Sequence, residues 1–84
     1  MDIYRFPETI FVKMLNSAKQ FQKIEEEFAE AQSATLTTQR DKEVVDMLQA
    51  IETYLRIREL EGLDVAELMR EHEEYTRGRG YYRE

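Results

Sequence analysis

The chain has 84 residues, a formal net charge of −6 and no cysteine. The acidic charge argues against broad nucleic-acid binding, which needs a positive field, and the lack of cysteine excludes disulfides and thiolate metal sites. The length fits one domain over residues 1–84, which buries only about 60% of the surface of its unfolded chain. We therefore expect oligomerisation or a bound metal to supplement a marginal core.

Hydropathy and the first residues bear on where the protein acts. No apolar run in the sequence approaches the ~20 residues that a membrane span needs. The start, MDIYRFPE, lacks the basic and apolar regions of a signal peptide. We therefore expect a cytoplasmic protein without a membrane or nucleic-acid partner.

Helical periodicity of apolar residues predicts an all-α fold of three to four helices packed as a bundle. The expected elements are four helices and a tail, at residues 7–17, 18–33, 39–61, 65–76 and 77–84. Pro7 suits a first helical turn, and the pattern leaves open whether the first helix breaks near Asn16 or runs on. Gly62 suits a left-handed helix end.

Capping residues predict where these helices begin. Ser17 and Gln20 have the spacing of a capping box, and so do Asp64 and Glu67. Thr38, with an acidic residue three positions later, is expected to cap the third helix.

Apolar positions predict how the helices pack. The second helix carries a stripe of Phe21, Ile24, Phe28 and Ala31. The third helix is apolar over more of its circumference than the others, which is typical of a central helix.

Two pairs of carboxylates have the spacing that places side chains together on a helix. Glu27 and Glu30 are three residues apart, and so are Glu43 and Asp46. Residues at this spacing have Cβ atoms about 5–6 Å apart. If the second and third helices pack antiparallel, the pairs can converge. All-oxygen ligands favour Mg²⁺ or Mn²⁺, although a solvated acidic face is the ordinary alternative.

These segments resemble the MazG-like nucleotide pyrophosphohydrolases of the all-α NTP pyrophosphatase superfamily. The family pattern is EExxE, a variable spacer, then ExxD. Residues 26–30 (EEFAE) match the first half and residues 43–46 (EVVD) match the second. The resemblance covers about residues 18–60 and includes the order of acidic helix, loop and central helix.

The resemblance implies a function and roles for individual residues. In such enzymes a metal-activated water attacks the α-phosphorus of an NTP or dNTP, and the products are the monophosphate and pyrophosphate. The implied cofactor is Mg²⁺, with Mn²⁺ as a substitute, and the implied assembly is a homodimer or homotetramer. The implied metal ligands are Glu27, Glu30, Glu43 and Asp46. Glu26 and Glu27 are the implied catalytic carboxylates, with Glu26 supporting the metals or the attacking water.

The C-terminal tail resembles small phage and prophage members of the family less closely. Those proteins often end in a Lys-Asn pair followed by Arg-Gly-Tyr. Residues 79–81 (RGY) fit, but residues 75–76 (YT) stand where Lys-Asn is expected. Arg77, Arg79 and Tyr81 are the candidate substrate-binding residues, and a frayed basic tail is the alternative.

A second hypothesis is a non-catalytic helical oligomer or partner-binding module that keeps the fold. The departure at residues 75–76 and the short chain favour it. The sequence therefore supports two hypotheses, a magnesium-dependent nucleotide pyrophosphohydrolase and a helical interaction module.

Overall fold

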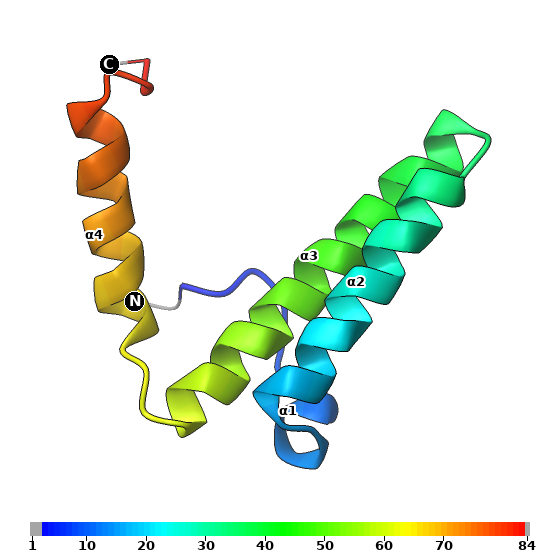
Figure 1. Ribbon diagram of the computed structural model, residues 1–84, viewed down its shortest axis with the longest axis horizontal. Helices are drawn as coiled ribbons and strands as arrows, with labels where there is room; N and C mark the ends of the chain where they lie inside the picture. Colours follow the sequence, from blue (N-terminus) through cyan, green and yellow to red (C-terminus); the bar gives the residue numbers. More distant parts are fainter. Residues whose placement is uncertain (1–2, 84) are drawn as a thin grey trace.

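The protein is described by a computed structural model covering residues 3–83, and this part of the chain forms helices joined by short irregular segments (Figure 1). The helices are α1 (Phe11–Met14), α2 (Ser17–Ser33), α3 (Thr37–Leu60) and α4 (Val65–Gly78). α2 and α3 form an antiparallel hairpin, while α4 stands away from it (Figure 1). The all-α prediction is confirmed, and α3 is central because α1, α2 and α4 all contact it. Among the described helices, none is both long and apolar enough to span a membrane.

The first helix is much shorter than the expected span of residues 7–17. α1 is a single turn, and residues 3–9 are not helical. The backbone N–H groups of Arg5 and Phe6 donate to the carboxylate of Glu52 on α3, at 2.8–3.0 Å. The guanidinium of Arg56 donates to the Phe6 carbonyl at 2.9 Å. The contact with Arg56 occupies the Phe6 carbonyl, which would accept the first hydrogen bond of a helix beginning at Pro7.

α2 begins at Ser17 and ends at Ser33, so its expected position is confirmed. The capping residue is Asn16, whose side chain accepts a hydrogen bond from the Lys19 N–H at 2.8 Å. The prediction of a capping box at Ser17 and Gln20 was therefore wrong by one residue. Gln20 instead turns inward toward α3, where its amide donates to the Ala50 carbonyl at 3.0 Å.

α3 begins two residues earlier than expected, at Thr37, after a connection of three residues. Leu36 precedes it without a capping side chain, so the cap predicted at Thr38 was wrong. At the other end Gly62 adopts a φ of 105°. The Leu63 N–H then bonds to the Arg58 carbonyl at 2.9 Å, and the Gly62 N–H bonds to the Glu59 carbonyl at 3.0 Å. This is a Schellman motif, as the sequence predicted at Gly62.

α4 begins after Asp64, whose side chain accepts from the Glu67 N–H at 3.1 Å. The Asp64 half of the predicted capping box is therefore confirmed. The Glu67 carboxylate, which would complete the box, pairs with Arg70 instead. The helix continues to Gly78, two residues beyond the predicted end. Ion pairs along its surface, including Arg77 with Glu73 at 3.6 Å, support this last turn.

The α2 cap provides a direct test of the fold. Asn16→Ala removes the acceptor for an orphan N–H and should destabilise the protein by about 1 kcal/mol. For a domain of this size that lowers the melting temperature by about 4–8 °C. The control is Thr38→Ala, because Thr38 lies inside α3 and caps nothing. Thermal unfolding followed by circular dichroism should show a loss for Asn16→Ala alone, and equal losses would contradict the assigned caps.

Candidate metal centre

The contact between α2 and α3 follows a row of residues at alternating three- and four-residue spacing on each helix, as in a coiled coil. On α2 the row consists of Gln20, Ile24, Glu27 and Ala31. On α3 it consists of Glu43, Asp46, Ala50, Thr53 and Ile57. Such rows are normally apolar. Here polar groups occupy much of the row, and Gln20 and Thr53 are only 1% and 3% exposed.

This packing corrects the stripe expected on α2. Ala31 is buried, but Phe21 and Phe28 are 52% and 51% exposed. They flank the row instead of filling it, and Phe21 contacts Tyr54 of α3 edge to face with ring centroids 5.9 Å apart. The helix face with the most hydrophobic residues is therefore not the face that lies deepest against α3.

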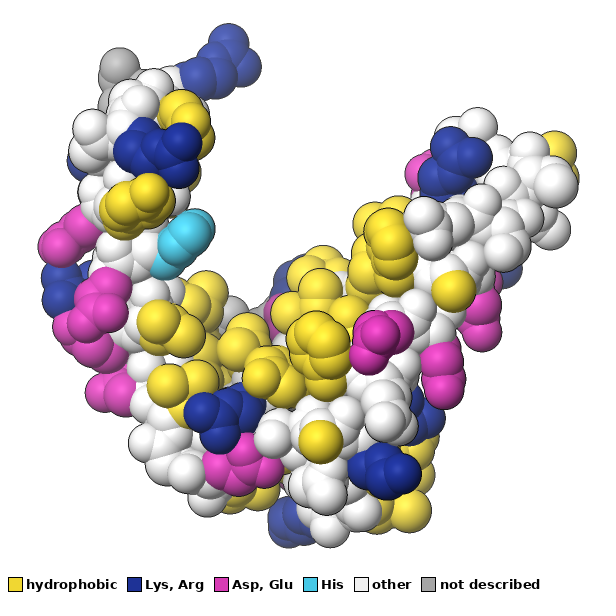
Figure 2. Space-filling view, in the orientation of Figure 1, with side chains coloured by type: hydrophobic (Ala, Val, Ile, Leu, Met, Phe, Trp, Pro, Cys, Tyr) yellow, Lys and Arg dark blue, Asp and Glu magenta, His cyan; other side chains and the backbone are white. Residues whose placement is uncertain are grey.

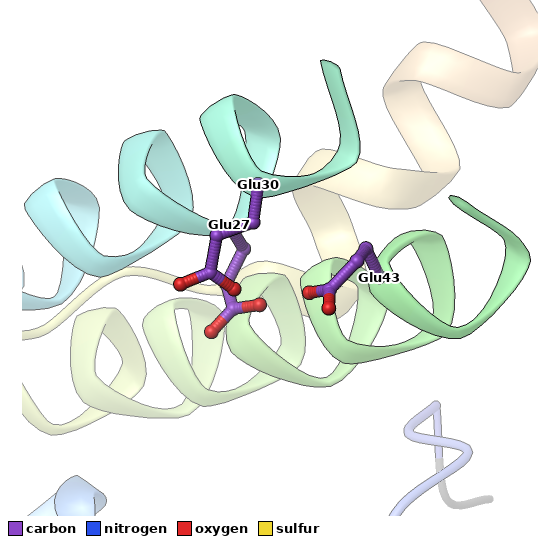
Figure 3. A group of neighbouring side chains, drawn as sticks. All are labelled: Glu27, Glu30 and Glu43. Atoms are coloured by element: carbon purple, nitrogen blue, oxygen red, sulfur yellow. The ribbon is translucent and has the colours of Figure 1, made fainter. Parts of the chain in front are cut away.

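Three of the four predicted ligands meet in the α2–α3 row. Carboxylate oxygens of Glu27, Glu30 and Glu43 all lie within 4.8 Å of one another, and Figure 3 shows the two α2 side chains beside that of α3. Glu27 and Glu43 are half-buried, while Glu30 is exposed. Asp46 lies next to them and lines a cavity with Glu27 and another with Glu43. Three of the four carboxylates therefore lie together in the antiparallel pair, and Asp46 is not part of the group whose oxygens lie within 4.8 Å.

The clustered charges raise the pKa of two of these groups. Burial is the largest cause for Glu27, and the charges of Glu30 and Asp46 raise its pKa further. For Glu43 a hydrogen bond with Glu30 is the largest cause, followed by burial and by the nearby carboxylates. Burial and the neighbouring carboxylates therefore make Glu27 and Glu43 harder to ionise than an isolated glutamate.

The cluster fits a hard divalent cation. The Oε2 atoms of Glu27 and Glu43 are buried and have no hydrogen-bond partner. Buried carboxylate oxygens without partners are costly, and a cation satisfies both their charge and their lone pairs. The donor set, all carboxylate oxygen, suits Mg²⁺ or Mn²⁺.

Two cavities flank the carboxylates, and each also has a lysine. The inner cavity, of about 230 Å³, includes Gln20, Lys23, Glu27 and Asp46. The outer cavity, of about 680 Å³, includes Lys42 together with Glu30, Glu43 and Asp46. The ammonium of Lys23 also lies over the Phe11 ring, 4.5 Å from its centroid. The cluster therefore has a positive charge beside it on two sides.

Sequence reasoning did not select Gln20, Lys23 or Lys42. The signal for Gln20 was its spacing of seven residues from Glu27, which puts both on the same helix face. Lys23 precedes Glu27 by four residues, a spacing that also makes the two side chains neighbours. Both spacings are visible in the sequence. The apolar stripe on the adjacent face of α2, however, predicted that this adjacent face packs against α3.

The predicted substrate-binding residues lie elsewhere in the chain. Arg77, Arg79 and Tyr81 are at the end of α4, on the arm that stands away from the hairpin (Figure 1). There the guanidinium of Arg79 stacks on the Tyr81 ring at 4.5 Å, and it donates to the Tyr81 hydroxyl at 2.6 Å. The two cavities beside the carboxylates include no residue of α4. Within one chain the structure does not bring these residues to the cluster.

Glu26 is also outside the group of converging carboxylates. It is exposed on α2, whereas its neighbour Glu27 faces α3. Consecutive helical residues point about 100° apart, which explains the difference. Its implied supporting role in catalysis stays a prediction.

Comparisons with known proteins do not add a family assignment. No family model, no curated protein and no solved structure matches the chain. The resemblance to MazG-like enzymes therefore depends on residues 26–30 and 43–46, and the chemistry of the site depends on the geometry described above.

The raised pKa values predict a pH effect on stability in the absence of divalent cations. Glu27 and Glu43 bind protons more tightly in the folded state than at their usual pKa of 4.5. Stability should therefore fall as the pH rises from about 4.5 through the raised values. Adding Mg²⁺ at neutral pH should restore stability, by about 2.7 kcal/mol at 100 times its Kd.

The measurement is the melting temperature of the parent and of Glu27→Gln from pH 4 to 8, with and without Mg²⁺. Glu61 beside Arg58 and Glu67 beside Arg70 have lowered pKa values and act in the opposite direction, so the parent is compared with the variant. Glu25→Gln, on the exposed side of α2, is the charge-matched control. A magnesium effect that persists in Glu27→Gln would contradict the site.

Proposed function

We propose that this protein is a magnesium-dependent nucleotide pyrophosphohydrolase that converts an NTP or dNTP to the monophosphate and pyrophosphate. The observation that carries the proposal is the convergence of Glu27, Glu30 and Glu43 within 4.8 Å, two of them with buried oxygens that have no partner. Asp46 beside them completes the set of four carboxylates that the family pattern assigns to the metals.

The surroundings of the cluster suit a polyphosphate. An acidic protein repels a triphosphate unless cations lie between the two. Bound by the four carboxylates, Mg²⁺ would supply charge neutralisation at the phosphates and would lower the pKa of a nearby water. Lys23 and Lys42 line the flanking cavities and can contact phosphate oxygens that extend away from the cluster.

The inner cavity supplies room for the nucleoside part of the substrate. It extends from the carboxylates past Gln20 to Thr9 and Phe11, beside α1. Its lining is mostly polar, with one aromatic ring at Phe11 and with amide and hydroxyl groups that can hydrogen-bond a base. The substrate can therefore lie with its phosphates at the cluster and its base toward α1.

Self-association is part of the proposal, as a homodimer or homotetramer. The described residues include four buried hydrophobic side chains, Val12, Ala31, Ile57 and Val65. A core of this size is marginal for an isolated domain. A second copy would add buried apolar surface without changing the α2–α3 row.

A non-catalytic interaction module is the second candidate, and one observation favours it. Arg77, Arg79 and Tyr81, which the resemblance assigns to substrate, contact other residues near the end of α4 and lie apart from the carboxylates. In that case the carboxylate cluster would bind a cation that only stabilises the fold.

The activity test is incubation of the purified protein with each NTP and dNTP plus Mg²⁺ or Mn²⁺, followed by measurement of pyrophosphate release. We expect turnover of at least one nucleotide, and a decrease of about 100-fold or more for Glu43→Gln, since metal sites lose such factors even when supporting residues are changed. Glu25→Gln should retain activity.

Calorimetry with a non-hydrolysable nucleotide separates the two candidates if turnover is absent. Binding of Mg²⁺ alone, without magnesium-dependent binding of nucleotide, would overturn the enzymatic proposal and support a structural cation site. Equal turnover by the parent and Glu43→Gln would show that the activity does not come from this cluster.

A further inference from the structure

α4 presents an apolar stripe that has almost no partner within its own chain. Its residues Leu68, Met69, His72 and Tyr75 share one side of the helix by their spacing. Leu68 and Met69 are each 46% exposed. Of the residues in α4, Val65 at the helix start is the one that is buried. An amphipathic helix ordinarily buries such a stripe against another element. Within one chain, the apolar stripe on α4 therefore lacks the helix or loop against which such a stripe ordinarily packs.

α3 presents a second unpartnered stripe, on the side of the helix that faces away from the row contacting α2. It consists of Val44, Leu48, Ile51 and Leu55, at spacings of four, three and four residues. Val44, Leu48 and Ile51 are 46%, 44% and 36% exposed. This spacing is that of a coiled-coil seam, which accepts one further helix along its length. We call these residues the α3 stripe, and Leu68, Met69, His72 and Tyr75 the α4 stripe.

The chain itself keeps the two stripes apart. The Schellman turn at Gly62 directs α4 away from α3, so the two helices contact each other near the turn and diverge beyond it. Figure 2 shows hydrophobic side chains on both sides of the hollow between α4 and the hairpin. Leu68, Met69 and His72 line a hollow of about 1000 Å³ together with Ile3 and Tyr82, and no residue of the α3 stripe is part of its lining.

The exposed area matches what a stable dimer needs. A compact monomer of 10.1 kDa has an accessible surface of about 5,300 Å². This chain exposes 6631 Å². The excess, about 1,300 Å² per chain, is more than the roughly 800 Å² per partner that a specific interface of standard size buries. An interface that removes this excess would bury about 2,600 Å² in total, which is the size of an obligate homodimer interface rather than a standard one.

The stripes fit each other better than they fit an unrelated partner. Each is a row of apolar residues at three- and four-residue spacing, so each can accept the other as a neighbouring helix. A two-fold axis pairs α3 of one copy with α4 of the other twice, which covers both stripes on both copies. The charged face of α4 is already paired within the helix, with Arg70 contacting Glu67 and Glu74, and so does not call for a charged partner.

We propose that the protein forms a two-fold dimer in which α4 of each copy lies on the α3 stripe of the other. The two stripes contain none of the clustered carboxylates. This assembly can therefore be present or absent whether or not the chain hydrolyses nucleotides.

The first test is the mass of the full chain by light scattering and analytical ultracentrifugation over a range of concentrations. We expect twice the 10.1 kDa of one chain. Leu48→Glu and Leu68→Lys should each yield monomers, because each places a charge in the contact. Leu36→Glu, at an exposed residue outside both stripes, should remain dimeric. A parent that stays monomeric at every concentration would overturn the proposal.

Mixing the two stripe variants tests which surfaces meet. In a mixed dimer of Leu48→Glu and Leu68→Lys, one α3–α4 contact carries an opposite-charge pair and the other is unchanged. We therefore expect mixing to restore the dimer. If either variant alone stays dimeric, the contact does not join the two stripes.

Cross-linking keeps the proposal testable if a charged variant fails to fold. The chain has no cysteine, so Leu48→Cys and Leu68→Cys each introduce a single thiol. Mixed under oxidising conditions, the two variants should form a disulfide between copies in preference to the like pairs. Formation of like pairs alone would overturn the exchanged arrangement.

Discussion

The structure depends on a helix pair whose contact row contains charged residues. Glu27 and Glu43 occupy positions on α2 and α3 that a coiled coil fills with Leu or Val, and Glu30 joins them there. Burial is the largest cause of the raised pKa of Glu27, and the hydrogen bond with Glu30 is the largest cause for Glu43, while the charges of neighbouring carboxylates raise both. A divalent cation would offset the cost of burying and clustering these carboxylates. The same feature that weakens the bare helix pair therefore makes it a candidate cation site.

The rest of the described chain holds this row in place. Gln20 donates to the Ala50 carbonyl across the row at 3.0 Å, and Thr53 contacts Thr9 at 2.9 Å. The extended segment before α1 is tied to α3 through Glu52 and Arg56. These polar contacts substitute for apolar packing at several points. A rigid pair of helices with a small hydrophobic core is consistent with a site that gains stability when a ligand binds.

Much of the fold could be predicted from the sequence, because it follows local rules. The positions of α2, α3 and α4, the Asp64 cap and the helix end at Gly62 all follow from periodicity and capping chemistry. The short length of α1 could not be predicted, because Arg56 on α3 binds the Phe6 carbonyl that would accept the first hydrogen bond of a helix beginning at Pro7. The turn at Gly62 was predicted, but the direction in which it sends α4 was not.

The candidate site divides in the same way. The pairs Glu27 with Glu30 and Glu43 with Asp46 could be selected from spacing, since residues three apart share a helix face. The burial of these carboxylates between α2 and α3 could not be predicted, because the apolar stripe of Phe21 and Phe28 predicted that a neighbouring face of α2 packs against α3. The roles of Arg77 and Arg79 came from a resemblance alone, and within one chain those residues lie away from the cluster (Figure 1).

The most direct test of the central claim is the release of protons when Mg²⁺ binds. Carboxyl groups with raised pKa values carry part of a proton in the bare protein at mildly acidic pH, and a bound cation displaces it. Adding Mg²⁺ to weakly buffered protein should therefore acidify the solution at a pH above the usual carboxyl pKa of 4.5, where the groups with raised pKa values still carry protons. Glu27→Gln and Glu43→Gln should release fewer protons, and Glu25→Gln should match the parent. Magnesium binding without proton release, or release that is equal in all four proteins, would contradict a cation site in the α2–α3 row.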